Sequence, residues 1–209
     1  MIVREKNPVY RLLELPWVYN LSQAVLAPGA QKGIVGHVKT MLSGLPSAPR
    51  MLDVGSGPVS WLWRVGLNPV GLDSSKDYLV RFNRHGGKSV AGSTVALPFE
   101  EGSFDAVWCF FTLHHMPDDA ARRAISEMQR VCRPGGYVAV CDAIMPRSVW
   151  NRPVPWALRR LDRGGHVRPQ RDMESLLSQP AAWDCTRVEY SWLRYEALFC
   201  LYRKTDRSK

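Results

Sequence analysis

The sequence predicts an α/β domain organised around a mostly parallel sheet. Residues 50–54, 70–73 and 104–111 are short apolar runs with the length of buried strands. Stretches with helical spacing separate them, and this alternation is typical of parallel sheets covered by helices. At 209 residues, with 45% apolar and 22% charged side chains, the chain has the size and composition of one globular domain.

A glycine turn follows the first predicted strand. Asp53 lies in the strand, and Gly55, Ser56 and Gly57 come next. Glycine adopts positive φ and lets a ligand approach the backbone, and free N–H groups at a helix start favour an anionic group. The order of strand, glycine turn and helix indicates a nucleotide-type pocket, although ordinary turns share this pattern.

The second predicted strand ends in Asp73, 18 positions after Gly55. An acidic residue about 20 positions beyond such a turn binds the hydroxyl pair of a ribose. Ser74 and Ser75 are suitable caps for a helix over residues 76–83. The third strand is expected at residues 90–92.

Motifs in one order along residues 50–142 resemble the class I S-adenosylmethionine-dependent methyltransferases, in particular the small-molecule group often called type 11. These motifs are residues 51–57, 70–73, 97–99, 103–108, 113–115 and 133–138. The resemblance implies a Rossmann-like, doubly wound sheet of seven strands with an antiparallel last strand, N-terminal helices and a lid after the fifth strand. It also implies methyl transfer with S-adenosylmethionine as the cofactor.

The same resemblance divides the single domain into four parts: an N-terminal helical cap (1–46), a cofactor-binding core (50–142), a basic lid (143–171) and a last helix with a C-terminal hairpin (172–209). Val59 stands where relatives carry a third glycine, and Ser93 where they carry an aspartate. The residues assigned to the cofactor are Asp53, Gly55, Ser56, Gly57, Asp73, Ser74, Ser93, Thr94 and Phe110.

The predicted catalytic residues follow the fourth and fifth strands. His114 and His115 lie in the loop after residues 104–111, and Asp142 ends a strand over residues 137–142. Ligands bind at the carboxyl ends of parallel strands, where these groups could take a proton from an acceptor. Equally, a histidine could tie down the loop and Asp142 could satisfy loop amides. No metal site is predicted, because only Asp118, Asp119 or Asp142 could add ligands to the histidines.

A basic segment follows Asp142. Seven arginines and one acid, Asp162, lie between Arg147 and Arg171, and residues 154–161 suggest a short amphipathic helix. In the family this position often holds a lid over the acceptor, and arginine grips phosphate and carboxylate groups. A solvated basic face is the alternative. The predicted acceptor-binding residues are Tyr10, Tyr19, Arg147, Trp150, Arg159 and Arg160.

The end of the chain predicts a helix capped by Asp172 and running to Leu177, followed by two strands at residues 186–191 and 197–202. The five cysteines are scattered without a Cys-x-x-Cys pair, so we expect reduced, buried thiols. No apolar run is long enough to cross a bilayer and the N-terminus is a poor signal peptide, which predicts a cytoplasmic protein.

These observations predict methyl transfer to a small acceptor that is anionic or linked to a lipid or sugar. The net charge of +9 is consistent with an anionic partner. The residues leave other readings open: an RNA methyltransferase, a non-catalytic cofactor-binding protein, and contact with a membrane surface. The oligomeric state and the acceptor atom are not predicted.

Overall fold

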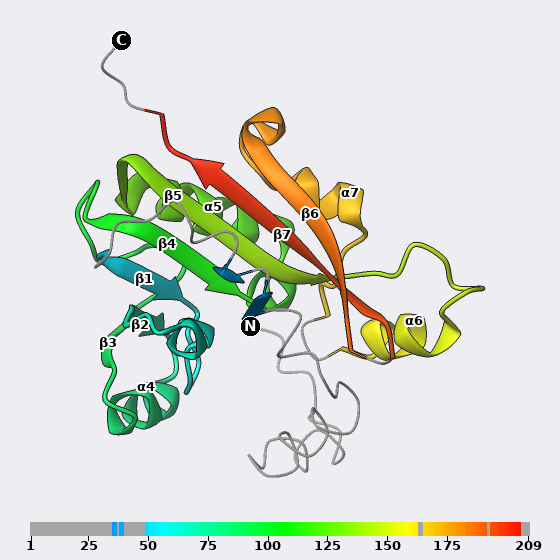
Figure 1. The fold of residues 1–209 in the computed structure, drawn as a ribbon, viewed down its shortest axis with the longest axis horizontal. Coiled ribbons are helices and arrows are strands. Elements are labelled where there is room, and N and C mark those ends of the chain that lie inside the picture. Colours follow the sequence, from blue (N-terminus) through cyan, green and yellow to red (C-terminus); the bar gives the residue numbers. More distant parts are fainter. Residues whose placement is uncertain (1–34, 37, 40–48, 163–164, 192, 206–209) are drawn as a thin grey trace.

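The computed structural model describes residues 35–36, 38–39, 49–162, 165–191 and 193–205. Seven strands form one sheet in the order β3-β2-β1-β4-β5-β7-β6 (Figure 1). The strands β1 to β5 pair in parallel, and β7 is antiparallel to both β5 and β6. The predicted seven-stranded sheet with a reversed last strand is therefore confirmed. The strands are β1 (Met51–Val54), β2 (Val70–Asp73), β3 (Lys88–Ala91), β4 (Phe104–Phe110), β5 (Cys132–Ile144), β6 (Trp183–Tyr190) and β7 (Tyr195–Arg203).

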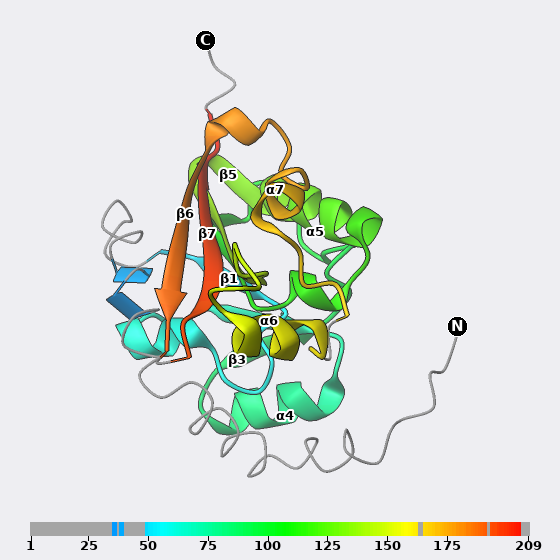
Figure 2. The same cartoon turned by 90° about the vertical axis from the view of Figure 1, so that its right-hand side faces the viewer.

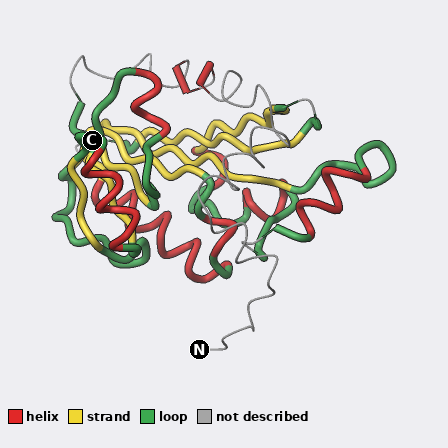
Figure 3. Tube along the Cα trace, turned by 90° about the horizontal axis from the view of Figure 1, so that it is seen from below, coloured by secondary structure: helices red, strands yellow, loops and turns green. Residues whose placement is uncertain are grey.

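Helices cover the sheet on both sides; in Figure 3 the strands run through the middle of the molecule with helices above and below. Ser75 caps α4, as predicted, by accepting the Tyr78 N–H, and Ser60 caps the short η1 by accepting the Leu62 N–H. None of the helices in the described ranges is long and apolar enough to cross a membrane. The helices are η1 (Trp61–Val65), α4 (Lys76–Arg84), η2 (Leu113–His115), α5 (Asp118–Val131), α6 (Pro153–Arg160), α7 (Gln170–Glu174) and η3 (Pro180–Ala182).

The core lies in two clusters, one on each face of the sheet. Neighbouring residues of a strand point to opposite faces, so Leu52 belongs to one cluster and Met51 to the other. The predicted apolar stripe of α5 packs on the first face, where Ile125 and Met128 are fully buried. Both faces of β4 and β5 are therefore covered, which explains their nearly continuous apolar sequence.

The topology fixes where a ligand can meet the sheet. The strand order reverses between β1 and β4, and in such sheets the binding crevice lies at the carboxyl ends of the strands beside that switch. Since β7 is antiparallel to β5 and β6, the end of β6 lies at the same edge as the end of β5. The glycine turn, the loop after β4 and the tip of the β6–β7 hairpin thus share one edge.

The predicted boundaries differ from the structure mainly where pairing extends a strand. The fifth strand was expected over 137–142 but runs over Cys132–Ile144, because its end pairs with β7 and its start forms an irregular pair with Phe104. The last two strands are longer for the same reason. The last helix, α7, begins at Gln170 after Pro169, so Asp172 lies inside its first turn and not at its cap.

The expectation of reduced cysteines is wrong for two of the five. Cys185 and Cys200 lie directly opposite each other on β6 and β7 and form a disulfide. The register of the two adjacent strands brings these cysteines together, and their spacing in the sequence alone does not indicate it. Cys109, Cys132 and Cys141 are free and buried, as predicted.

Candidate active site

The turn after β1 has backbone angles that glycine adopts without strain. The φ angles of Gly55 and Gly57 are +69° and +60°. The N–H groups of Gly55 and Ser56 both donate to the Leu72 carbonyl, at 2.7 and 3.0 Å, which holds the turn against β2. A Cβ on Gly55 would lie 2.5 Å from the Thr112 side chain, whereas one on Gly57 would meet nothing within 4 Å. Gly57 therefore leaves open space beside its backbone, as close approach of a ligand requires.

Asp73, at the end of β2, faces this turn. Its Oδ2 accepts the Gly57 N–H at 3.0 Å and its Oδ1 accepts the Ser75 N–H at 2.8 Å. A carboxylate oxygen has more than one acceptor position, and Asp73 is only half-buried. The backbone thus fixes the carboxylate while each oxygen can still accept a hydrogen bond from a ligand hydroxyl.

Asp53 is buried in β1, two residues before the first glycine of the same turn. The Ser60 hydroxyl donates to its Oδ2 at 2.6 Å. Burial raises the pKa of Asp53 to about 7; the Ser60 hydrogen bond opposes this shift and the nearby Asp73 charge adds to it. Among the described residues no cation pairs with Asp53, and such a buried carboxyl group suits a ligand that brings its own positive charge. The assignment of Asp53, the glycine turn and Asp73 to S-adenosylmethionine is consistent with this geometry and stays a prediction.

The other residues that were predicted to bind the cofactor differ in how exposed they are. Ser93, exposed after β3, accepts the Val95 N–H through its hydroxyl, and Thr94 beside it is half-buried. Ser74 is exposed next to Asp73, and Ser56 is buried in the turn. Phe110 lies within the core, 5% exposed and stacked on Trp108. Its role on the path of the methyl group stays a prediction.

His114 and Asp142 form a buried pair at the ends of β4 and β5. The imidazole Nδ1 lies 2.5 Å from Asp142 Oδ1, and the backbone N–H of His114 donates to Asp142 Oδ2 at 2.9 Å. The Thr112 hydroxyl lies 3.2 Å from the Gly55 carbonyl, so the loop that carries His114 also contacts the glycine turn. The structure therefore brings two of the three predicted catalytic residues together beside the predicted cofactor residues.

Each member of this pair stabilises the charged form of the other. Burial acts to lower the pKa of His114, but the carboxylates of Asp142 and Asp162 outweigh it and raise that pKa. Burial likewise acts to raise the pKa of Asp142, while His114 and two backbone N–H groups outweigh it and lower the pKa. The pair is thus an imidazole oriented by a carboxylate, an arrangement that can accept a proton at Nε2. His115, the third predicted residue, is exposed with its ring 4.1 Å from that of His114.

The lid segment reaches the same pair, a contact that the sequence did not reveal. Asp162 Oδ1 lies 3.7 Å from His114 Nε2, and the His166 N–H donates to the His114 carbonyl at 3.1 Å. Arg168 is buried and donates to the carbonyls of Leu113, His166 and Met116 and to Asp118. It was predicted as one member of a basic run, but its side chain joins the lid to the loop after β4.

The predicted acceptor-binding residues have separate environments. Arg159, whose side chain is 10% exposed, donates to the Tyr190 hydroxyl and lies 4.6 Å over the Tyr195 ring, so the hairpin tip occupies its guanidinium. Arg160 lies 4.9 Å over the Trp156 ring, and Trp150 is 90% exposed. Tyr10 and Tyr19 lie outside the described residues.

Arg147 lines a cavity of about 230 Å³ at the end of β6, together with Arg152, Arg187, Glu189 and Glu196. Glu196 pairs with Arg152 and Arg187, whereas Arg147 makes no ion pair with any residue that the structure describes. Burial lowers the pKa of Arg187 to about 10, and the charges of Arg147 and Arg152 add to this shift. The cavity therefore carries an excess of positive charge close to the carboxyl edge.

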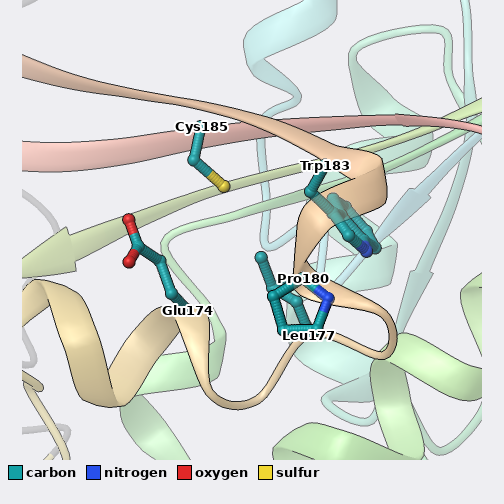
Figure 4. Close-up of a pocket in the computed structure, with 5 residues that line it drawn as sticks. All are labelled: Glu174, Leu177, Pro180, Trp183 and Cys185. Atoms are coloured by element: carbon teal, nitrogen blue, oxygen red, sulfur yellow. The ribbon is translucent and has the colours of Figure 1, made fainter.

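A second cavity, of about 280 Å³, lies between α7, η3 and the start of β6 (Figure 4). Leu177, Pro180, Trp183, Glu174 and Cys185 line it. Because β6 begins at the opposite end of the sheet from the carboxyl edge, this cavity is remote from His114 and the glycine turn.

Comparison with known proteins agrees with the site. The methyltransferase-domain family model matches residues 52–140. A demethylmenaquinone methyltransferase of Roseiflexus castenholzii is 38% identical over 147 residues, which cover 66% of this chain but only 60% of that protein. An uncharacterised methyltransferase of Synechocystis is 30% identical over 200 residues, covering 91% of this chain and 86% of the relative.

The solved structure of a Thermotoga maritima S-adenosylmethionine-dependent methyltransferase, described as a possible histamine N-methyltransferase, shares the fold. Its TM-score is 0.68 at 15% identity, with 93% of this chain and all of that chain covered. The family model and the Synechocystis relative agree with the enzyme class and cofactor that the sequence predicted. The chain belongs to the class I S-adenosylmethionine-dependent methyltransferases.

Proposed function

We propose that the chain methylates a small hydroxylated ring of the quinone type, with His114 as the base that takes the hydroxyl proton. The single observation behind this proposal is the His114–Asp142 pair, buried at the carboxyl edge and in contact, through its loop, with the glycine turn. The acceptor class is supported by the Roseiflexus relative, which is named for demethylmenaquinone. Because this chain covers 60% of that relative, the acceptor belongs to the proposal alone.

Each end of the cofactor has a group of this chain to hold it. Asp53 would balance the positive charge of the amino-acid part, Gly55, Ser56 and Gly57 would line its backbone side, and Asp73 would accept from the ribose. Ser74 would extend the contact beside Asp73, and Ser93 and Thr94 would face the adenine. S-adenosylmethionine supplies a methyl group that its sulfonium already activates.

The remaining work is to align and deprotonate the acceptor. Asp142 holds Nδ1 of His114, which directs Nε2 toward the edge as the proton acceptor. Removing the proton from a ring hydroxyl makes the ring a stronger nucleophile, and its orientation in a water-poor site lowers the barrier further. Asp162 lies beside Nε2 and would stabilise the imidazolium that forms.

We further propose that the acceptor carries an anionic or lipid-linked group. The positive cavity at Arg147 lies next to the end of β5 and suits a carboxylate or phosphate.

Three further predictions stay predictions: the single-domain organisation, the contribution of Tyr10 and Tyr19, and the cytoplasmic location. Cell fractionation would test the last of these.

The test is release of S-adenosylhomocysteine from S-adenosylmethionine with a panel of acceptors. The panel contains hydroquinones with and without an acidic group, non-aromatic alcohols and RNA. Turnover of the hydroquinones that is lost in His114→Asn supports the proposal. Turnover of RNA alone would replace the acceptor class, and cofactor binding without any turnover would make the chain a binding protein.

A further inference from the structure

The outer face of the lid is apolar where a surface helix is normally polar. The described residues expose seven large apolar side chains, and four of these lie in the short segment from Val149 to Leu161. Trp150 is 90% exposed, Leu161 68% and Val154 52%. Figure 1 shows this segment reaching out beyond the end of β5, and Figure 2 shows α6 on the outside of the fold. The exposed apolar side chains thus belong to a segment that projects from the body of the protein.

Spacing places two of these side chains on one face of α6. Val154 lies in the first turn of the helix and Leu161 is its C-terminal cap seven positions later, so both lie on one face, while Trp150 precedes the helix in a turn. We refer to Trp150, Val154 and Leu161 together as the exposed apolar stripe of the lid. The opposite face holds the helix in place, because Pro155 is buried and Arg159 contacts Tyr190 and Tyr195. The sequence predicts a short amphipathic helix here, and in the structure its apolar residues Val154 and Leu161 are exposed. Anchoring by arginine has turned the apolar face outward.

The charge of the segment is of one sign. No acidic residue lies between Arg147 and Leu161 in the sequence. Arg152 and Arg159 contact glutamates and a tyrosine, whereas Arg147 and Arg160 of the same segment are exposed. An exposed tryptophan and aliphatic side chains flanked by arginines have the composition of a helix that lies in a membrane interface.

We propose that this outer face of the lid, Trp150, Val154 and Leu161 with Arg147 and Arg160, docks on an anionic lipid bilayer. The apolar side chains enter the interface, and the two guanidinium groups meet the lipid phosphates. A lipid surface fits better than a protein partner, because residues 147–161 contain arginines and no acidic residue, and the exposed apolar groups lie on a projecting segment. Docking would turn the carboxyl edge, which α6 borders, toward the bilayer. The inference does not depend on the acceptor or on methyl transfer.

The test is co-sedimentation of the full chain with vesicles of phosphatidylcholine alone and with vesicles that also contain phosphatidylglycerol. We expect binding to the anionic vesicles that weakens with salt. Trp150→Ser combined with Leu161→Ser should weaken it at least about tenfold. Arg160→Gln should weaken it about fivefold. The matched control is Val80→Ser on α4, a valine that is 49% exposed elsewhere.

Three outcomes would overturn the proposal. The chain could fail to bind anionic vesicles, the double variant could bind as the parent does, or Val80→Ser could weaken binding equally. Sedimentation without vesicles adds a further check: a parent that self-associates and a double variant that does not would assign the stripe to a second copy of the chain. Equal thermal midpoints of parent and variants ensure that the comparison concerns folded protein.

Discussion

Asp142 contacts His114 twice. One carboxylate oxygen lies 2.5 Å from the imidazole Nδ1, and the other accepts a hydrogen bond from the backbone N–H of His114 at 2.9 Å. One carboxylate therefore sets both the position of the loop and the orientation of the ring. Because Asp142 raises the pKa of His114, the same contact also sets the pH at which His114 can accept a proton.

The pH dependence of turnover should report this pair. A base must be deprotonated, so kcat/KM should rise with pH through the raised pKa of His114. Asp142→Asn removes the charge that raises this pKa and should move the rise to lower pH while lowering the plateau. His114→Gln should abolish the rise. A profile that is identical in parent and Asp142→Asn would exclude the pair as the base.

The stability of the ligand-free chain should depend on Asp53. Its pKa is raised from 3.8 to about 7, so its contribution to stability is fully present below pH 4 and is lost as the pH rises through 7. Asp53→Asn cannot ionise and should be more stable than the parent above pH 7 by roughly 1–3 kcal/mol. Denaturant unfolding at several pH values measures this, with the exposed Asp184→Asn as control. Parallel curves for parent and Asp53→Asn would contradict it.

Loss of the Asp73 carboxylate should weaken cofactor binding. Asp73→Ala removes a charge-assisted acceptor and should cost roughly 1–3 kcal/mol of binding free energy by calorimetry. Asp77→Ala, four residues later in α4, is the control and should bind normally. Unchanged cofactor affinity in Asp73→Ala would show that Asp73 does not bind the ribose.

The two glycines of the turn should respond differently to alanine. Gly55→Ala combines positive φ with a clash against Thr112 and should cost about 2–4 kcal/mol of unfolding free energy. Gly57→Ala meets no atom of the chain, so positive φ alone should cost about 1–2 kcal/mol. Its methyl group would enter the space beside the turn, so cofactor affinity should fall more than stability. Equal effects of both variants on stability would refute the distinction.

Two arginines of the lid should have different roles, Arg147 in acceptor binding and Arg159 in stability. Arg147→Ala should raise KM for an acidic acceptor but not for a neutral one, and it should leave the thermal midpoint unchanged. Arg159→Ala should destabilise the protein by about 1–3 kcal/mol, because it leaves the buried Tyr190 hydroxyl without its partner. An unchanged KM in Arg147→Ala for every acceptor would leave the cavity without a role in recognition.

The sequence predicted the elements whose signals are local. The run from Phe104 onward, the caps at Ser75 and the stripe of α5 each depend on neighbouring residues, and each was found. Contacts between distant segments were not predictable in this way. Arg159 belongs to a run of arginines that looks solvated, and only the hairpin tip at Tyr190 makes it a buried anchor. The pairing of Cys185 with Cys200 likewise depends on strand register, which spacing along the chain does not encode.

The contacts of Arg168 have a consequence for how acceptor preference could be altered. This side chain fastens the lid, at Arg168, to the loop that carries His114, so the position of the loop depends on the lid. A chimera that takes only the inserted segment from a relative would leave the loop without its fastener. Exchange of acceptor preference between relatives would therefore require transplanting both segments at once.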